Sequence, residues 1–325
     1  IVSVGMMSVI SCNKDLEVIE GTPNPSTGTT IGEQLAATAS DSLFYKLVVK
    51  ANLLNALNNR AVKYTIFVPD NTAMIASGLS NAAVTALPAA SAAAIVNYNI
   101  YPQKFPAAAF PATFPNVQIS TLLGLDPTNP LVRMTSFPGK TGTQLYVNNV
   151  PLGATDIAAA NGVIHKPLAV IAPPSRLLKD TMDRVSNLTY FKAAIAKADS
   201  GQTNLNRFDS LRNYAVTNMT ILAPNDAAFQ TLIFGLVYSK VLGLTGDPVI
   251  ANAQATAAVG LGPAIFTTPA FYGDLSAATV RGILAYHLLA SNPTGSYQPN
   301  IRVFSVNIPA TPTAIKTLVN TSVAA

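Results

Sequence analysis

Few side chains in this sequence are of the types that catalyse reactions or bind metals. The chain has two histidines, His165 and His287, 122 residues apart, and one cysteine, Cys12. Metal sites and nucleophilic sites often show short spacings such as His-Glu-x-x-His, Cys-x-x-Cys or Gly-x-Ser-x-Gly. None of these occurs here. We therefore predict no catalytic, cofactor-binding or metal-binding residues and interpret both histidines as core or helix-capping residues. An enzyme stays open as a third reading, because a triad can assemble from residues far apart in sequence.

Cys12 has a context that points to a modification. It follows an apolar segment, residues 1–10, that is typical of the core of a secretory signal peptide. The run Val9-Ile10-Ser11-Cys12 resembles a bacterial lipobox, in which a small residue precedes the cysteine that is diacylated; Ile10 departs from the usual small residue. The alternative is a buried thiol, because cysteine is also a good small core residue. We predict lipidation of Cys12.

The residues after Cys12 indicate where such an anchor would place the chain. Asn13-Lys14-Asp15-Leu16-Glu17 resembles the signal that sends some lipoproteins to the outer face of the outer membrane. Residues 20–30 are rich in Gly, Thr, Pro and Ser and indicate a flexible tether. Residues 1–30 are thus predicted to be a partial signal peptide, a lipobox and a tether. The expected location is the outer membrane, lipid-anchored at the cell surface, with the periplasmic face as the alternative.

The composition limits what the rest of the chain does. At 325 residues it is long enough for two ordinary domains. Charged residues make up 11% of the chain, and the net charge of +5 comes from scattered lysines and arginines. Nucleic-acid binding normally needs a clustered basic stripe, so we predict no nucleic-acid partner. After the N-terminus the richest apolar run, residues 231–244, is shorter than the roughly 18 residues of a membrane helix and contains Lys240.

Apolar periodicity predicts helices first and strands later within one domain. Residues 43–57 repeat apolar side chains every three or four positions, and residues 80–98 form an alanine-rich helical stretch. After Pro102 the pattern changes to short strand-like runs separated by Pro, Gly and Asn. This order favours an α+β fold over alternating βαβ units.

The most informative feature is an internal repeat. Residues 65–74 read Thr-Ile-Phe-Val-Pro-Asp-Asn-Thr-Ala-Met, and residues 220–229, which lie 155 positions later, read Thr-Ile-Leu-Ala-Pro-Asn-Asp-Ala-Ala-Phe. Proline ends a strand because it lacks an N–H group, and Asp or Asn then caps the next helix. We interpret both copies as a structural joint and not as a catalytic carboxylate site. Its members are Thr65, Pro69, Asp70 and Asn71, then Thr220, Pro224, Asn225 and Asp226.

At these residues the sequence resembles the fasciclin domain family. The repeat resembles the first motif of that family, and Asn161-Gly162-Val163-Ile164-His165 resembles the second. The family carries a Tyr-His pair between them, which is similar to Tyr286-His287, whereas the first copy has Tyr98-Asn99. The resemblance covers about residues 31–325. Asn161, Gly162 and His165 are accordingly expected to be structural.

The resemblance implies the architecture. It implies two tandem fasciclin-like domains, residues 31–174 and 175–325, each a helical layer packed on a mostly antiparallel β-sheet or wedge. The second copy ends before a second Asn-Gly-Val-Ile-His segment, so we expect it to be C-terminally incomplete, and the sequence to be incomplete at both ends. It also has about 33 extra residues, an insertion at about 231–271.

The insertion and the Tyr-His pair supply the candidate binding residues. We predict that the insertion contacts a partner, with an enlarged private core as the alternative, and that the Tyr-His pair is mainly structural with a minor share in ligand contact. The candidates are Tyr286, His287, Phe234, Tyr238, Phe266, Phe271 and Tyr272.

The resemblance implies a non-enzymatic cell-surface adhesion or interaction lipoprotein that binds proteins, glycans or matrix. The alternative is an accessory structural or transport lipoprotein subunit of an outer-membrane protein complex. Both readings place the protein at the membrane through a lipid anchor.

Overall fold

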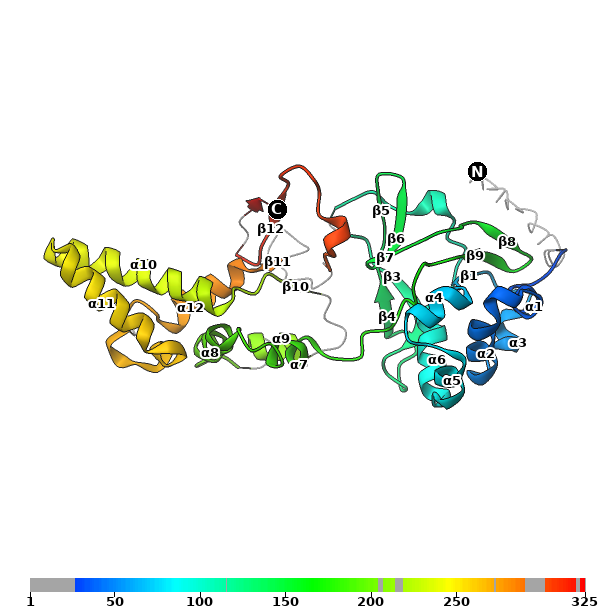
Figure 1. Cartoon of the computed structure of the whole chain (residues 1–325), viewed down its shortest axis with the longest axis horizontal. Coiled ribbons are helices and arrows are strands. Elements are labelled where there is room, and N and C mark those ends of the chain that lie inside the picture. The colour runs from blue at the N-terminus through cyan, green and yellow to red at the C-terminus, as the bar shows by residue number, and fades with distance from the viewer. Residues whose placement is uncertain are drawn as a thin grey trace, which may run out of the picture.

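The computed structural model describes residues 27–114, 116–203, 207–213, 219–271, 273–289, 302–319 and 322–324. The predictions for the signal segment, the lipobox and Cys12, and the binding prediction for Tyr272, lie outside these residues. The molecule is elongated, with the first domain at one end and a pair of helices, α10 and α11, at the other (Figure 1).

The first domain begins with a helical layer. Its helices are α1 (Ile31–Ala37), η1 (Ala39–Asp41), α2 (Ser42–Lys50), α3 (Leu54–Leu57), α4 (Asn71–Ala76), α5 (Asn81–Ala86), α6 (Ala89–Tyr98) and the short η2 (Ala107–Ala109). The Thr30 hydroxyl and the Glu33 carboxylate form a capping box at α1. Pro88 separates α5 from α6, so the single helical stretch predicted over 80–98 is two helices.

The strands of the first domain form three small sheets. The central one has the order β2-β1-β9-β8, and its strands are β1 (Tyr64–Phe67), β2 (Ile100–Tyr101), β8 (Ile157–Ala159) and β9 (Gly162–His165). β1 runs parallel to β9, and the other two pairs are antiparallel. The remaining strands are β3 (Ile119–Gly124) with β4 (Arg133–Ser136), and β5 (Pro138–Thr141), β6 (Gln144–Val147) and β7 (Val150–Pro151), all paired antiparallel.

Two apolar clusters hold the first domain together. One joins α1, α2 and α6 to β1 and includes the fully buried Phe44, Leu47 and Ile66. The other is aromatic and joins β1, β2 and β6 through residues such as Phe67 and Tyr101. Helices packed on mostly antiparallel strands confirm the predicted α+β class.

The second domain is mainly helical in the described residues. Its elements are α7 (Leu178–Asp183), α8 (Thr189–Ala198), α9 (Phe208–Asn213), β10 (Thr220–Ile221), α10 (Asp226–Thr245), α11 (Pro248–Gly260), η4 (Gly262–Thr267), η5 (Pro269–Phe271), α12 (Ala277–Tyr286), β11 (Leu288–Leu289), η6 (Ser305–Asn307), β12 (Ala314–Lys316) and β13 (Ser322–Ala324). Its core gathers α8, α10, α12 and η4 around Phe191, Phe229 and Phe266.

The second domain repeats part of the first. β10 pairs antiparallel with β11 just as β1 pairs with β2, and Thr220 opposite Leu289 matches Thr65 opposite Tyr101. β1 and β10 are 155 residues apart, whereas α6 and α12 are 188 apart. The difference of 33 equals the extra length predicted for the insertion, which the structure resolves as most of α10, all of α11, and η4 and η5.

A segment of the second domain packs against the first. The Asn116 side-chain amide donates to the Arg302 carbonyl (3.1 Å) and to Asn307 Oδ1 (2.9 Å), and the Thr141 hydroxyl donates to the Val306 carbonyl (2.8 Å). The Phe137 ring lies 5.9 Å from the Phe304 ring. Residues 302–307 therefore connect the two domains through side chains as well as through the chain.

Candidate functional site

The two polar residues of the repeated joint have different partners. Asp70 caps its own helix, since its carboxylate accepts the Ala73 N–H at 2.8 Å, and Asn225 does the same for Ala228 at 2.9 Å. The next residue reaches back to the preceding long helix. Asn71 Oδ1 accepts the Leu43 N–H at the start of α2 (3.0 Å).

Asp226 repeats the second contact in the other domain. Its carboxylate accepts the Tyr190 N–H (2.9 Å) and the Thr189 hydroxyl (2.8 Å) at the start of α8. Each joint thus satisfies the backbone donors of two helices at once. The carboxylates of Asp70 and Asp226 are occupied by these donors, as expected for structural residues. The sequence predicted one capped helix at each joint, and the tie to α2 and α8 was missed because those helices lie about 30 residues upstream.

Thr65 and Thr220 lie at the same place on their strands and both have backbone partners. Thr65 is fully buried, and its hydroxyl donates to the Gln103 carbonyl (2.8 Å) and accepts the Phe105 N–H (2.6 Å). The Thr220 hydroxyl accepts the Val303 N–H (2.8 Å). Pro69 and Pro224 follow the strand segments and precede the caps.

Asn161 and Gly162 fasten the first domain to its own beginning. The Asn161 side chain accepts the Ile31 N–H (2.8 Å) and donates to the carbonyls of Leu57 (2.7 Å) and Asn59 (3.1 Å). Gly162 has a φ of +153°, and a Cβ built there would lie 1.9 Å from the Tyr64 carbonyl oxygen. Only glycine allows β1 and β9 to approach this closely.

His165 is a core residue with both ring nitrogens occupied. It is fully buried, its Nδ1 accepts the Asp156 N–H (3.2 Å), and its Nε2 donates to the Phe105 carbonyl (2.9 Å). The ring stacks on Phe67 at 5.6 Å. Burial lowers the pKa of His165 below its ordinary 6.5. A neutral imidazole with no exposed nitrogen cannot serve a substrate, so this histidine is structural as predicted.

The Tyr-His pair of the second domain is more exposed than its counterpart in the first. Tyr98 is 1% exposed, and its hydroxyl donates to the Thr135 carbonyl and accepts from the Asn148 amide. Tyr286, at the equivalent end of α12, is 45% exposed. The expectation that Tyr286 supplies a large buried surface is therefore wrong. The strands that cover Tyr98 have no counterpart in the described part of the second domain.

His287 lies beside Tyr286 and shares its exposure. The two rings meet edge to face at 5.8 Å, and His287 is half-buried at the end of α12. Partial burial lowers the pKa of His287. Its first-domain counterpart, Asn99, is fully buried and donates to the carbonyls of Ile95 and Ile171. The structure thus brings an aromatic ring and a neutral imidazole together at an accessible helix end.

The remaining candidates in the insertion divide into two groups. Phe266 is 2% exposed, packs at 6.0 Å against Phe229, and belongs to the core, so the prediction that it contacts a partner is not supported. Phe271 is partly buried against the same core. Phe234 and Tyr238 stack on each other at 5.9 Å along α10 and are half-buried. The predicted apolar loop after residue 260 is therefore largely private packing.

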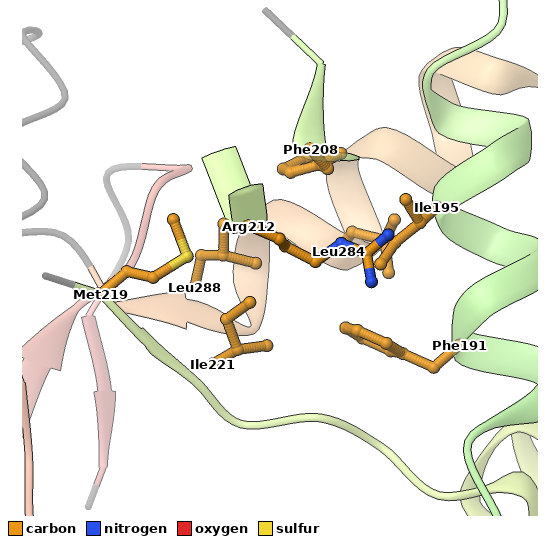
Figure 2. Close-up of a pocket in the computed structure, with 8 residues that line it drawn as sticks. All are labelled: Phe191, Ile195, Phe208, Arg212, Met219, Ile221, Leu284 and Leu288. Carbon is orange, nitrogen blue, oxygen red and sulfur yellow. The ribbon is translucent and has the colours of Figure 1, made fainter. Parts of the chain in front are cut away.

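A buried arginine was not identified from the sequence. Arg212 is 5% exposed and projects between Phe191, Ile195 and Leu284 (Figure 2). Its Nη2 donates to the Asp209 carboxylate (2.5 Å), while Nε and Nη1 have no hydrogen-bond partner. The cavity beside it measures about 10 Å³, which is room for one water and not for an organic ligand. No spacing rule signals such a residue, because its burial depends on α8 and α12 folding around it.

The described residues contain no group of three or more His, Cys, Asp or Glu side chains that could hold a metal ion. Where the structure is described, neither histidine has a nucleophile and an orienting carboxylate beside it. The exposed Tyr286–His287 pair is the site that best fits a binding role.

Comparison with known proteins agrees with the first-domain geometry. The family model of the fasciclin domain matches residues 40–173. A solved structure of a fasciclin domain pair from the insect cell adhesion molecule Fasciclin I is similar, with 15% identity, a TM-score of 0.33, and coverage of 88% of this chain and 83% of the other. No curated protein matches the chain. The described first domain is a fasciclin domain, and the chain belongs to the fasciclin domain family.

Proposed function

We propose that this chain is a non-enzymatic interaction protein of the cell surface that binds a protein or glycan ligand through its fasciclin domains. Fasciclin domains are associated with cell adhesion and protein interaction. The observation that carries the proposal is the exposure of Tyr286 and His287 at a position where the first domain buries Tyr98 and Asn99.

The chemistry of this pair suits recognition better than catalysis. An exposed tyrosine offers a flat apolar face and a polar tip, which is why tyrosine is enriched in interfaces. The adjacent imidazole adds a hydrogen-bond donor and an acceptor in its neutral form. A sugar ring or a peptide backbone would find both a stacking face and polar partners here. We assign ligand contact to Tyr286 and His287, with Phe234 and Tyr238 on α10 as further candidates.

Adhesion of coated beads tests the proposal. Beads that carry the chain are washed over surfaces coated with the chain itself, with extracellular-matrix proteins or with purified polysaccharides. We expect retention on at least one surface, and a loss of at least ten-fold with Tyr286→Ala. Ile75→Ala is the control, because Ile75 is 57% exposed on α4, far from the pair. Equal retention of the Tyr286 variant would remove the pair from the binding site.

We also propose that Cys12 carries a lipid anchor that holds the protein at the outer membrane, with the tether of residues 20–30 between anchor and domains. Two acyl chains give stable membrane residence, at about 0.8 kcal/mol for each buried CH₂. Cys12→Ser should move the native protein from the membrane to soluble fractions, and mass spectrometry should find acyl chains on the native N-terminus. A membrane-bound variant and an N-terminus without lipid mass would contradict the anchor.

Purification from detergent-solubilised membranes tests the kind of partner. Isolation of the chain alone, or with a soluble ligand, agrees with an adhesion module. A stoichiometric β-barrel partner would instead favour an accessory subunit of an outer-membrane complex.

A further inference from the structure

The turn between α10 and α11 exposes an apolar tip. Leu244 is 76% exposed and Val249 is 75% exposed, and Ile250 beside them is 45% exposed. Apart from Leu131 at 86%, Leu244 and Val249 are the most exposed large hydrophobic side chains in the described residues. These three residues, together called the tip, lie at the end of the molecule that is farthest from the first domain (Figure 1). Singly exposed apolar residues are ordinary, but a cluster at one projecting end marks a contact surface.

The charges near the tip are already neutralised or used by the backbone. Between Asp226 and Asp274 the sequence has two charged residues, Lys240 and Asp247. Lys240 Nζ lies 2.7 Å from the Asp274 carboxylate. Asp247 caps α11, since its carboxylate accepts the N–H groups of Val249 (2.8 Å) and Ile250 (3.3 Å). The hairpin therefore presents little charge that would hold it in water.

α10 has the composition of a membrane helix but is fixed to its domain. It is the one helix in the described residues that is long and apolar enough to cross a bilayer, with a mean hydropathy of 1.5 and 17% of its most apolar window buried. Its first turns, however, place Phe229 and Ile233 in the core with 3% and 2% exposure. A complete span would pull these residues out of the domain, so only the second half of the hairpin is available to a bilayer.

We propose that the tip inserts into the outer layer of a lipid bilayer, to the boundary between headgroups and acyl chains. The tip is a convex end and carries aliphatic side chains, glycine, threonine and proline. It has no Trp, Tyr or Arg, the residues that usually anchor a protein interface. Acyl chains accept a convex aliphatic surface without a matching pocket, and apolar faces of peripheral proteins are buried about 5–10 Å deep in this way. This membrane contact goes beyond the proposed ligand binding and is independent of the Cys12 anchor.

Vesicle binding by the full chain tests the inference. The Cys12→Ser background removes any acyl anchor, and the probe is extruded phosphatidylcholine vesicles, collected by flotation. We expect the chain to float with the vesicles and Leu244→Ser/Val249→Ser to lower the partition coefficient at least ten-fold. Leu131→Ser is the matched control, since it removes an even more exposed leucine from the turn between β3 and β4, and should change nothing.

A second measurement reports insertion itself. An environment-sensitive fluorophore on Leu244→Cys, in the same background, should shift its emission to the blue on addition of vesicles, and the same label on Leu131→Cys should not. Absence of flotation, equal flotation of the tip variant, or equal shifts at both labels would overturn the proposal. It would also be overturned if, without lipid, analytical ultracentrifugation showed a dimer that Leu244→Ser/Val249→Ser dissociates, because a second copy would then cover the tip.

Discussion

The two domains contain the same joint but surround it differently. In the first domain, β1 lies between β2 and β9, so the strand is paired on both edges. In the second, β10 is assigned one neighbouring strand, β11, in the described residues. Yet the cap by Asn225 and the tie from Asp226 to α8 keep the distances of their first-domain equivalents within 0.1 Å.

This difference separates what the joint needs from what the closing strands add. The helix caps and the tie between helices form without β8 and β9, because their partners all lie in the helices and the first strand. The closing strands add full burial, which Tyr98 has and Tyr286 lacks. The same position is therefore a core residue in one domain and a candidate contact residue in the other.

The largest effect is expected from shortening the insertion. Replacing residues 235–270 by a connection of first-domain length removes Ile265 and Phe266, which are 0% and 2% exposed. The expectation from the sequence, that this change preserves folding, is thus corrected, because each large core truncation costs about 2–5 kcal/mol. We expect calorimetry to lose the transition of the second domain and to keep that of the first. The tip variant Leu244→Ser/Val249→Ser should keep both, and loss of both with the shortened chain would mean that the domains do not fold separately.

The next largest effect compares the equivalent tyrosines. Tyr98→Ala should lower the free energy of unfolding by about 3–5 kcal/mol, because it removes a fully buried ring. Tyr286→Ala should cost about 1 kcal/mol or less, because nearly half of its surface is already in water. Urea denaturation followed by circular dichroism gives both values. A cost of several kcal/mol at Tyr286 would show that the second domain buries it.

The helix caps should give smaller and matched effects. Asp70→Ala and Asn225→Ala each remove one side-chain acceptor from a helix N-terminus, at a cost of about 1 kcal/mol. Equal losses in urea denaturation would support the view that the joint is independent of the closing strands. A clearly smaller loss for Asn225→Ala would tie the strength of the cap to the strands around it. Ser239→Ala on the exposed side of α10 serves as the control.

The smallest effect compares the histidines by pH. The folded-state pKa of His165 lies below 6.5, so between the two pKa values the unfolded chain binds more protons than the folded chain. The contribution of His165 to stability is complete above pH 6.5 and is lost as the pH falls toward the folded-state pKa. Between pH 7 and 6 only part of the unfolded imidazole is protonated, which keeps the change small. The unfolding free energy should depend less on pH in His165→Asn, and His287→Asn, which copies Asn99, is the comparison.

The sequence predicts the joints and the fold class well because these rest on local rules. Proline after a β-like run and Asp or Asn before a helix have the same meaning in any fold, so Pro69, Asp70 and Asn225 were placed correctly. The repeat spacing gave the 33-residue insertion. The core roles of Asn161 and His165 came with the family resemblance, and the structure gives them physical partners.

The rest depends on contacts between distant segments. Phe266 and Tyr286 are both aromatic residues in the second domain, and nothing in their local sequence says that one is buried and the other half in water. Arg212 is surrounded by α8 and α12, which lie on either side of it in the chain. The contact between residues 302–307 and the first domain joins segments about 190 residues apart, beyond the reach of any periodicity.

The clasp made by Asn161 sets the order in which the first domain can form during synthesis. The Asn161 side chain holds Ile31, 130 positions earlier, and β9 pairs with β1 almost a hundred residues upstream. Contacts of such long sequence separation slow folding, because a large loop must close before they form. At a ribosome speed of roughly 5–20 residues per second, the early helices wait several seconds for Asn161 and β9 to be made. The nascent chain therefore passes through a long stage with helices formed and β1 unpaired on one edge, which is the stage at which a chaperone would have most to protect.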